Sequence, residues 1–534
     1  MVINLDQRDF LQDQGDARYL RNVSIPANRG VIHDRNGEPL AISTPMESIW
    51  VNPKRINLNH ANLPQLAKFL NINLSKLKKD ISDRKGREFY YLSRQQPPAL
   101  AEKIMALRID GIATEREYYR FYPLGEVVAH LIGFTNIDGV GQEGAELMME
   151  PRLRGHAGSK RVLKDRLGNI VENLESINQP RNGDDLYLSI DRRIQYLAYR
   201  ELKAAVARNQ ARAGSAVVID VRTGEVLAMV NQPSYNPNNR AALDPAAMRN
   251  RAVTDIYEPG STMKPFTIAL ALESGLYTPE TVIDTNPGSV RIAGFTIYDH
   301  RNYGVLNLSG IIQKSSNVGA SQIALNMDTK HYWQLLDRFG FGKITDMGFP
   351  GESPGYLNEY QQWRRVDQAA LGYGYGLSVS TLQLTQAYSV LAAAGVMHPV
   401  SLFRRDKATN KSQQVIPERI SHEVIKMMEL VTQAGGTATS ARINGYRVAG
   451  KTGTVRVIGA NGYDEENYRG LFAGITPASN PRLAMVTVIE QPQAADYYGG
   501  IVAAPVFSRV MTGALRILDI PPDNLQAVSG SATQ

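Results

Sequence analysis

Ser215-Ala-Val-Val-Ile-Asp220-Val-Arg-Thr-Gly224-Glu-Val-Leu-Ala-Met-Val230 contains two apolar runs separated by a short polar turn. Apolar runs of this length on either side of a glycine-containing turn predict a β-hairpin. Just before it, residues 192–208 place Ile194, Leu197 and Leu202 near helical spacing, which predicts an amphipathic helix. A folded domain is therefore expected to begin with a helix followed by a hairpin.

The chain beyond the hairpin continues the same domain. Residues 471–475 and 483–490 predict two late strands, residues 508–518 predict a closing helix, and helical segments fill the middle. The expected fold class is therefore α+β, with a central antiparallel sheet assembled from both ends of one domain. This domain is expected over residues 191–520, and residues 521–534 are expected to be a disordered tail.

Residues 1–190 are expected to form a separate N-terminal module, because a chain of 534 residues is too long for one compact core. This part is rich in short segments with polar flanks. Asp34-Arg-Asn-Gly37 predicts a tight turn between two extended runs. Residues 64–70 predict a short helix with Pro64 in its first turn.

The composition excludes several classes of protein. The 59 basic and 52 acidic residues give a net charge of +7 and are spread along the chain without a long basic block. This balance fits loose attraction to an anionic polymer or membrane surface, or simply a mildly basic soluble protein, better than a nucleic-acid groove. The absence of cysteine excludes disulfides, a thiol nucleophile and a cysteine zinc site.

No stretch of the sequence is expected to span a membrane. The longest run without charged residues lies between Asp367 and Arg404, but Gly, Ser, Thr, Gln and Pro interrupt it. A span needs about 20 predominantly apolar residues, so this run is expected to be a buried domain segment. The first residues also lack the charged and apolar regions of a signal peptide.

A candidate nucleophile lies in Pro259-Gly-Ser261-Thr-Met-Lys264, directly before a helical run. If a helix starts near Ser261, then Ser261 and Lys264 share one face because they are three residues apart. The hydroxyl then has an amine beside it and the positive end of the helix beneath it. Burial and a second nearby cation would lower the pKa of Lys264 and let it act as a base. By itself the pattern is weak, and a polar helix start is the commoner explanation.

Two further elements follow along the chain. Ser315-Ser316-Asn317 lies between two helical runs, on a loop from which a hydroxyl and an amide could point into a cleft. Lys451-Thr452-Gly453-Thr454 begins a β-branched run that predicts a strand. Such a strand can lie beside a peptide substrate, where it offers backbone hydrogen bonds and a cation for a carboxylate.

Three other motif matches are rejected, because the residues around each one do not fit the structure that the motif requires. Residues 445–452 match G-x-x-x-x-G-K-T, but a phosphate-binding loop needs a following helix, and a strand is predicted here. Residues 351–355 match G-x-S-x-G, but Pro354 has no N–H for an oxyanion hole. His422-Glu423 lacks the second histidine of a zinc helix, because Lys426 holds that place. No metal site and no cofactor are expected.

Together, S-x-x-K, S-x-N and K-T-G in this order and at these separations resemble the signature of penicillin-binding proteins and serine β-lactamases. The resemblance implies a β-lactamase-like penicillin-binding domain, with helices flanking the sheet and a helical subdomain. It also implies acyl transfer through a serine.

Shorter motifs extend the resemblance over nearly the whole chain. Those resembling the N-terminal, dimerisation-type module of class B penicillin-binding proteins are Arg29-Gly30, Asp34-Arg-Asn-Gly37, Arg120-Phe-Tyr-Pro123, Ala129-His130, and Gly141 with Gly144 and Glu146. Residues 372–376, 472–474, 497–500 and 504–507 resemble the division-specific branch, of the penicillin-binding protein 3 type. The family implies a transpeptidase domain on an elongated, non-catalytic pedestal.

The resemblance implies a role for each residue of the three elements. Ser261 would attack the penultimate D-alanine carbonyl of a peptidoglycan stem peptide, with Lys264 as its base. Ser315 would relay a proton to the leaving amine, close to Lys451. Backbone N–H groups of Ser261 and Thr454 would form the oxyanion hole. The substrate-binding residues would be Asn317 for the amide, Thr452 and Thr454 for the terminal carboxylate, and Gly453 between them. Tyr497 and Tyr498 would line the cleft, but packing of these two aromatic rings within the fold explains their presence equally well.

Two other activities within the superfamily stay open. A β-lactamase must hydrolyse its acyl-enzyme quickly, and class A enzymes use a glutamate for that step, in the family motif E-x-x-L-N. The glutamates between Asn317 and Lys451, none of which begins that pattern, are Glu352, Glu359, Glu418, Glu423 and Glu429. Slow deacylation is therefore expected. A penicillin-recognising sensor would keep Ser261, and only turnover separates it from an enzyme.

The family also implies a location and partners. It works at the periplasmic face of the bacterial inner membrane on a single N-terminal anchor, which is absent from this sequence and expected upstream of Met1. The implied partners are peptidoglycan stem peptides, β-lactam antibiotics, and a membrane glycan polymerase with other division proteins. No nucleic acid is expected.

Overall fold

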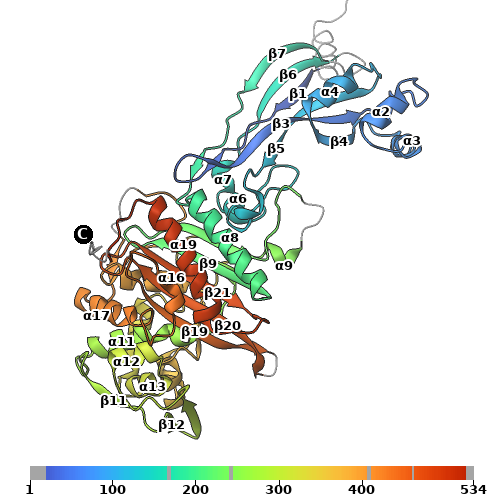
Figure 1. Cartoon of the computed structure of the whole chain (residues 1–534). Coiled ribbons are helices and arrows are strands. Elements are labelled where there is room, and N and C mark those ends of the chain that lie inside the picture. The colour runs from blue at the N-terminus through green and yellow to red at the C-terminus, as the bar shows by residue number, and fades with distance from the viewer. Residues whose placement is uncertain (1–19, 165–169, 240–243, 406–410, 460–461, 525–534) are drawn as a thin grey trace, which may run out of the picture. The chain divides into compact units, whose positions relative to one another are not determined.

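The computed structural model describes residues 20–164, 170–239, 244–405, 411–459 and 462–524, which form two compact units (Figure 1). Of these described residues, unit 1 contains those in the ranges 20–33, 39–123 and 134–186. Unit 2 contains those from 187 to 524, and also residues 34–38 and 124–133. Two short N-terminal segments therefore belong with the C-terminal unit. Residues 525–534, where most of the expected tail falls, lie outside the described residues.

Unit 1 contains two sheets, one with the strand order β1-β6-β7 and one with the order β4-β3-β2-β8, in which β5 also pairs with β3. The predicted turn after His33 joins β2 to β3, and the predicted short helix is α2. The strands are β1 (Leu20–Ile25), β2 (Ile32–His33), β3 (Pro39–Val51), β4 (Tyr90–Gln96), β5 (Ile112–Phe121), β6 (Gly158–Lys164), β7 (Ile170–Asn178) and β8 (Leu186–Tyr187). The helices are α2 (Leu63–Phe69), α3 (Leu74–Ser82), α4 (Pro98–Met105), α6 (Gly144–Met148) and α7 (Glu150–Leu153).

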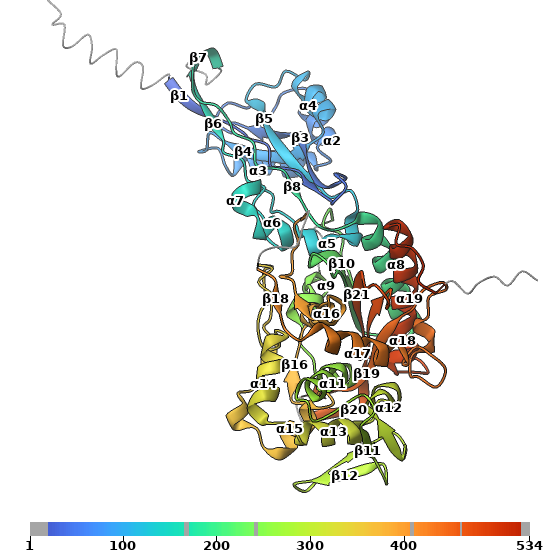
Figure 2. The same cartoon turned by 90° about the vertical axis from the view of Figure 1, so that its left-hand side faces the viewer.

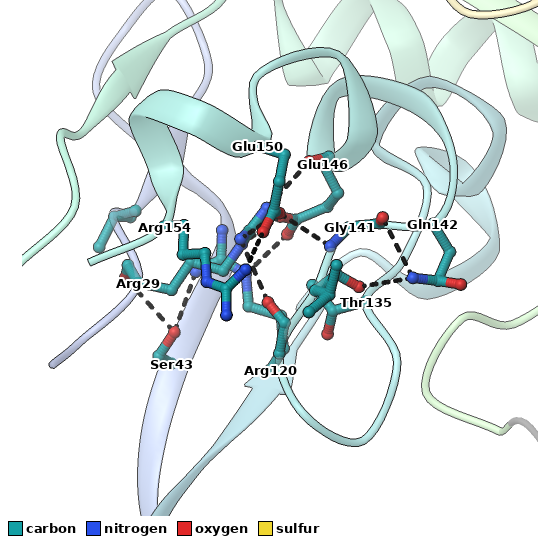
Figure 3. Close-up of polar contacts among 12 residues, drawn as sticks. Arg29, Ser43, Arg120, Thr135, Gly141, Gln142, Glu146, Glu150 and Arg154 are labelled. Atoms are coloured by element: carbon teal, nitrogen blue, oxygen red, sulfur yellow. Dashed lines mark hydrogen bonds and ion pairs between the residues drawn. The ribbon is translucent and has the colours of Figure 1, made fainter. Parts of the chain in front are cut away.

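Three of the N-terminal motifs meet in one buried ion network of unit 1 (Figure 3). Nε of Arg29 lies 2.6 Å from one carboxylate oxygen of Glu146, and Nε of Arg120 lies 2.7 Å from the other. Arg29 also lies 2.6 Å from the carboxylate of Glu150. Arg29, Arg120 and Glu146 are buried, so the ion pairs among them must offset the cost of removing each charge from water. The motifs therefore tie the loop before β2, the end of β5 and α6 together.

Glu146→Ala is expected to destabilise unit 1 by about 3–5 kcal/mol, because two buried guanidinium groups lose their shared carboxylate. Urea unfolding should show a lower midpoint for this variant. Glu88→Ala is the control, since it removes an exposed ion pair with Lys54 and should cost less than about 1 kcal/mol. Equal midpoints for Glu146→Ala and the wild type would show that the network adds no stability.

Unit 2 is built on one five-stranded sheet with the order β10-β9-β21-β20-β19, in which all neighbours are antiparallel. The predicted hairpin is β9 (Ala213–Asp220) with β10 (Glu225–Gln232), and β9 lies beside the late strand β21 (Leu483–Glu490). The remaining strands are β20 (Gly462–Thr476) and β19 (Ala449–Gly459). The prediction of a central antiparallel sheet assembled from both ends of the domain is therefore confirmed.

Helices cover both faces of this sheet. The predicted helix α8 (Arg192–Arg208) lies beside α19 (Ala504–Ile517) (Figure 1). A Cβ on Gly214 would lie 3.0 Å from a side-chain carbon of Leu202 in α8, whereas the hydroxyls of Ser215 and Thr381 are 2.8 Å apart. Since successive strand residues point to opposite faces, the helix that starts at Thr381 covers the other face.

That helix, α16 (Thr381–Ala392), is buried along its whole length. It lies inside the charge-free run between Asp367 and Arg404, so the prediction of a buried domain segment there is confirmed. The helix carries no charged residue, so its burial leaves no charge without a partner.

A helical subdomain with small two-stranded ribbons occupies one end of unit 2 (Figure 2). Its helices are α11 (Lys264–Glu273), α12 (Leu308–Lys314), α13 (Asn317–Leu325), α14 (Thr329–Arg338), α15 (Arg365–Leu371) and α17 (Glu418–Glu429). Its ribbons are β11 (Val282–Asp284) with β14 (Val305–Asn307), and β12 (Ser289–Ile292) with β13 (Phe295–Tyr298). The shorter elements of unit 2 are η1 (Gly125–Val127), α5 (Ala129–Ile132), α9 (Pro245–Met248), α10 (Arg251–Thr254), η3 (Gly260–Met263), β15 (Tyr356–Leu357), η4 (Tyr360–Gln362), β16 (Leu377–Ser378), β17 (Val396–Met397), β18 (Gln413–Gln414), η5 (Thr439–Ala441) and α18 (Gly499–Val502).

One segment of the described residues, Gly499–Ile517, is long and apolar enough to cross a membrane by length and composition alone. Half of its apolar window is buried within the unit, where α19 packs on α8 and β21. Core helices of globular domains have the same length and composition, and the contacts of α19 with α8 and β21 are those of a core helix.

Candidate active site

Ser261 and Lys264 lie on one turn of helix. Residues 260–263 form the 3-10 turn η3, which continues at Lys264 into α11. Nζ of Lys264 lies 2.9 Å from Oγ of Ser261. The two residues therefore share a face, as their spacing predicts.

A glycine brings a neighbouring loop against this turn. Gly374 has φ +90°, and a Cβ there would lie 1.9 Å from the carbonyl oxygen of Gly260. The N–H of Gly260 donates to the carbonyl of Gly374 at 2.9 Å. Residues 372–376, which the sequence marks as a family motif, therefore fix the backbone directly before Ser261.

Lys264 is the centre of a polar cluster. Its Nζ lies 2.6 Å from the carbonyl oxygen of Ser315, 3.1 Å from Oγ of Ser315 and 2.8 Å from Oδ1 of Asn317. Nζ of Lys451 lies 2.8 Å from the same Oγ of Ser315. Both lysines are fully buried. The four residues proposed from the sequence as catalytic thus form one connected cluster.

The S-x-N loop turns Ser315 toward the lysines. Ser315 ends α12 in the left-handed region at φ 60°, ψ 41°, which costs a residue with a Cβ about 1–2 kcal/mol. Ser316 then caps α13, because its side chain accepts the N–H of Gly319 at 2.9 Å. These two helices hold Ser315 in the geometry that presents both its carbonyl and its hydroxyl to Lys264.

Asn317 uses its side-chain amide within the protein. Its Oδ1 contacts Lys264, and its Nδ2 donates to the carbonyl of Tyr298 at 3.0 Å. An amide nitrogen carries two hydrogens, so one is left for a substrate carbonyl. Asn317 therefore orients Lys264 in addition to the substrate contact that the family resemblance implies.

Asp299 supports this loop, and no sequence motif marks it. Its carboxylate accepts the N–H of Asn317 at 2.5 Å, the N–H of Val318 at 3.0 Å and the hydroxyl of Ser316 at 2.6 Å. Asp299 directly follows β13 and lies 18 residues before Asn317, too far along the chain for a local sequence pattern to reveal the contact. A carboxylate at the N-terminus of α13 also suits the helix dipole.

Glu258 is a second residue that the motifs miss. Its carboxylate accepts the N–H of Gly376 at 2.9 Å and the hydroxyl of Tyr463 at 2.9 Å. Burial raises its pKa, although these two hydrogen bonds oppose the shift. The carboxylate three residues before the nucleophile is thus engaged by the protein itself.

Lys451 lies on the edge strand β19 of the sheet. Within the described residues no strand pairs with the outer edge of β19, so its backbone can meet an extended peptide. A Cβ on Gly453 would lie 3.1 Å from the carbonyl oxygen of Pro259, so glycine lets this strand approach the nucleophile turn.

The two threonines of the K-T-G element have hydroxyl partners. The hydroxyls of Thr452 and Thr437 lie 2.8 Å apart, and Oγ1 of Thr454 accepts the N–H of Gly499 at 3.1 Å. Thr437 is exposed, and no motif marks it. These contacts fix the side chains that the family resemblance assigns to the substrate carboxylate.

Burial changes the charge state of both lysines. Burial, and then the nearby positive charge of Lys451, hold the pKa of Lys264 well below its usual range, while Asp299 opposes the shift. Burial lowers the pKa of Lys451 to about 7. Lys264 can therefore be neutral and accept a proton at neutral pH, while Lys451 still carries part of a positive charge.

The second-order rate constant for acylation by penicillin should fall as the pH rises through about 7. Lys451 loses its proton there, and with it the positive charge that the sequence predicts for binding a substrate carboxylate. The rate should also fall at low pH, where Lys264 becomes protonated and can no longer act as a base. Stopped-flow acylation across pH checks both limbs.

A penicillin methyl ester is the control for the alkaline limb, because it has no carboxylate for Lys451 to attract. It should react slowly and without that limb. An alkaline limb of equal size for the ester would assign it to another group.

Tyr497 and Tyr498 extend an aromatic row beside β20. The ring of Tyr497 is stacked on Tyr468 at 4.1 Å and 13°, and its centroid lies 4.7 Å from that of Tyr498. Tyr498 remains 41% exposed, and its ring centroid lies 6.5 Å from that of His300. Tyr497 thus has mainly a packing partner, whereas Tyr498 faces the S-x-N side of the cleft.

The three rejected motif matches lie in the contexts expected of them. The chain after Thr452 continues as strand β19. Ser353 lies in an irregular segment before β15, where its backbone N–H donates to the carbonyl of Val253. His422 lies on α17, where its Nε2 is 3.8 Å from the carboxylate of Glu418.

Both units match known protein domains. Residues 214–512 match the penicillin binding protein transpeptidase domain, and residues 24–188 match the penicillin-binding protein dimerisation domain. The chain is 43% identical over 526 residues to the probable peptidoglycan D,D-transpeptidase PbpC of Pseudomonas aeruginosa, covering 98% of this chain and 93% of that protein. It is 44% identical over 522 residues to the peptidoglycan D,D-transpeptidase FtsI of Escherichia coli, covering 97% and 88%.

A solved structure agrees with these matches. The transpeptidase domain of penicillin-binding protein 3 from Burkholderia pseudomallei is 42% identical, with a TM-score of 0.58, covering 63% of this chain and 97% of that chain. The chain therefore belongs to the penicillin-binding protein family, with a dimerisation domain followed by a transpeptidase domain. Members of this family transfer peptidoglycan stem peptides through a serine, and this chain is a serine-type D,D-transpeptidase.

Proposed function

We propose that this transpeptidase crosslinks stem peptides in the septal cell wall through an acyl-enzyme on Ser261. The observation that carries the proposal is the buried amine of Lys264, 2.9 Å from Oγ of Ser261 and joined through Ser315 to Lys451. A serine hydroxyl needs a base close by, and a lysine with a lowered pKa supplies one at neutral pH.

In the first half of the reaction, Oγ of Ser261 attacks the carbonyl carbon of the penultimate D-alanine and gives its proton to Nζ of Lys264. The bond to terminal D-alanine breaks, and the leaving amine takes a proton through Oγ of Ser315, which lies 3.1 Å from Lys264 and 2.8 Å from Lys451. Backbone N–H groups of Ser261 and Thr454 stabilise the oxyanion, and each such donor contributes about 3–4 kcal/mol in related enzymes.

In the second half, an amine from a neighbouring stem peptide attacks the ester and loses a proton as the serine hydroxyl is restored. The donor peptide lies along the outer edge of β19, with Thr452 and Thr454 at its terminal carboxylate and Lys451 nearby. Gly453 keeps this strand close to Ser261, and Asn317 contacts the substrate amide.

A β-lactamase is the second candidate, and the structure offers it little support. Three of the glutamates between the second and third elements are engaged elsewhere: Glu352 accepts the hydroxyl of Thr345, Glu423 pairs with Lys426, and Glu429 pairs with Arg447. Rapid hydrolysis needs a carboxylate that activates water beside the ester. Slow deacylation is the expected behaviour, and β-lactams should therefore act as lasting inhibitors.

The context of the enzyme is also part of this proposal. The domain boundaries expected near residues 190 and 520 divide a non-catalytic pedestal from the transpeptidase domain. The pedestal docks a membrane glycan polymerase and other division proteins, and an N-terminal anchor holds the protein at the periplasmic face of the inner membrane. Support comes from the match to FtsI and from the connected cluster of Ser261, Lys264, Ser315 and Lys451, all of which lie outside residues 1–190.

The proposal is tested by intact-mass measurement after incubation with benzylpenicillin, followed by peptide mapping. One penicilloyl group on the peptide that contains Ser261 is expected. Incubation with a stem peptide ending in D-alanyl-D-alanine should release D-alanine and, with an amine acceptor, yield a crosslinked product. An adduct without any turnover would indicate a sensor, and an adduct on another serine would reject the site.

A further inference from the structure

The S-x-N element and the K-T-G element, which form the two walls of the proposed site, approach each other at a buried point, here called the base, and at an exposed point, here called the rim. At the base, Nζ of Lys451 lies 2.8 Å from Oγ of Ser315. At the rim, the ring of His300 faces the ring of Tyr498, with centroids 6.5 Å apart and planes at 63°. One ring comes from the loop after β13 and the other from the residue before α18, so this contact joins the S-x-N wall to the K-T-G wall.

His300 is held on the S-x-N wall by its neighbour in the chain. The carboxylate of Asp299 bonds the backbone of Asn317 and Val318 and the hydroxyl of Ser316. The backbone of His300 is therefore joined through Asp299 to the S-x-N loop, although the side chain of His300 is exposed.

Tyr498 is held on the K-T-G wall in a similar way. The next residue, Gly499, donates its N–H to Oγ1 of Thr454 at 3.1 Å. A Cβ on Gly499 would lie 2.3 Å from the carbonyl oxygen of Gly453, so the chain lies directly on the strand. The Tyr498 ring leans on Tyr497, whose own ring is stacked on Tyr468. Both rings of the rim contact are therefore positioned by the catalytic elements themselves.

The rim contact is weak enough to open and close. Aromatic pairs attract at centroid separations of about 4.5–7 Å, and 6.5 Å is near the outer limit. Both side chains are exposed, so water competes for the contact. An entering peptide can replace the contact between the rings with more contacts of its own than a single water molecule can make.

The ester on Ser261 has two possible fates. An amine converts it to an amide and a free serine hydroxyl, and water converts it to a carboxylic acid and the same hydroxyl. Crosslinking requires the first outcome, although water is far more abundant. Exclusion of water from a closed site is a general way to suppress such a side reaction.

We propose that His300 and Tyr498 form a clasp over the acyl-enzyme that favours transfer of the acyl group to an amine over its hydrolysis. His300 is thereby a specificity-determining residue for the second half of the reaction. This inference rests on the proposed acyl-enzyme at Ser261 and extends it to the choice of acceptor.

The test uses a thioester donor with D-alanine as the acceptor amine and measures the ratio of amide to acid products. His300→Ala should lower this ratio about fivefold, equivalent to about 1 kcal/mol, and should shorten the lifetime of the penicilloyl-enzyme by a similar factor. His300→Phe keeps a ring at the rim and should return both values close to those of the wild type. Tyr498→Ala should give the same shift, and the double variant should add little to it.

Tyr196→Ala is the matched control, because it removes an exposed tyrosine of the same unit on α8. It should leave the ratio unchanged. The inference is overturned if His300→Ala keeps the wild-type ratio and lifetime, or if His300→Phe behaves like His300→Ala. Loss of labelling at Ser261 in the wild-type protein would instead contradict the proposed function.

Discussion

Ser261→Ala is expected to abolish covalent labelling by benzylpenicillin and all release of D-alanine from a stem peptide. The substitution removes the one oxygen that forms the ester, so no acyl-enzyme can accumulate. It removes little else, because the fold of the turn rests on the backbone contact between Gly260 and Gly374. Intact-mass measurement should show the unmodified protein, with a thermal midpoint close to that of the wild type.

Ser353→Ala is the matched control, because Ser353 is the serine of the rejected G-x-S-x-G match at residues 351–355. Its hydroxyl accepts the N–H of Gly355 at 3.3 Å, within an irregular segment of the same unit. Labelling and turnover should be unchanged in this variant. A remaining adduct in Ser261→Ala, or a lost adduct in Ser353→Ala, would move the nucleophile to another residue.

Lys264→Ala should slow acylation by about 10²- to 10⁴-fold, a loss of about 3–5 kcal/mol in transition-state stabilisation. The variant removes the amine 2.9 Å from Oγ of Ser261, and with it the proton acceptor. It also removes the contacts of that amine with Ser315 and Asn317. The second-order rate constant for acylation, measured over hours with excess penicillin, gives the size of the loss.

Lys314→Ala tests whether the loss is specific to Lys264. Lys314 directly precedes Ser315, but its Nζ donates to the carbonyl of Gly435 at 2.9 Å, outside the catalytic cluster. Acylation should change less than about threefold, as expected for removal of one exposed contact. A loss as large as that of Lys264→Ala would indicate that both variants act by disturbing the S-x-N loop.

Local patterns account for most of the elements that the sequence predicts correctly. The hairpin of β9 and β10, the helix α8 and the late strand β21 each follow from the spacing of apolar residues within a few turns or strand positions. The pairing of Ser261 with Lys264 is also local, since three residues of helix bring them together. The buried ion network of unit 1 shows the limit of such reasoning, because its three motifs are recognisable but the contact among them is not.

The contacts missed from the sequence depend on distant segments. Asp299 and Glu258 belong to the site through loops whose paths no periodicity describes. Residues 34–38 and 124–133 belong with unit 2 although they lie within the N-terminal part of the chain. A carboxylate that accepts backbone N–H groups has no preferred spacing along the chain, so it leaves no pattern to detect.

The sequence by itself indicated the class of the fold and the order of three short motifs, and it predicts Ser261 as the nucleophile, because apolar spacing and each single motif involve residues close together in the chain. Only the tertiary structure decided that Lys264 and Lys451 are buried on either side of Ser315, and burial is what lowers the pKa of both amines. It also decided that His300 meets Tyr498 across the cleft. Desolvation and contact across a cleft are properties of packed atoms, and these appear only when distant segments occupy the same space.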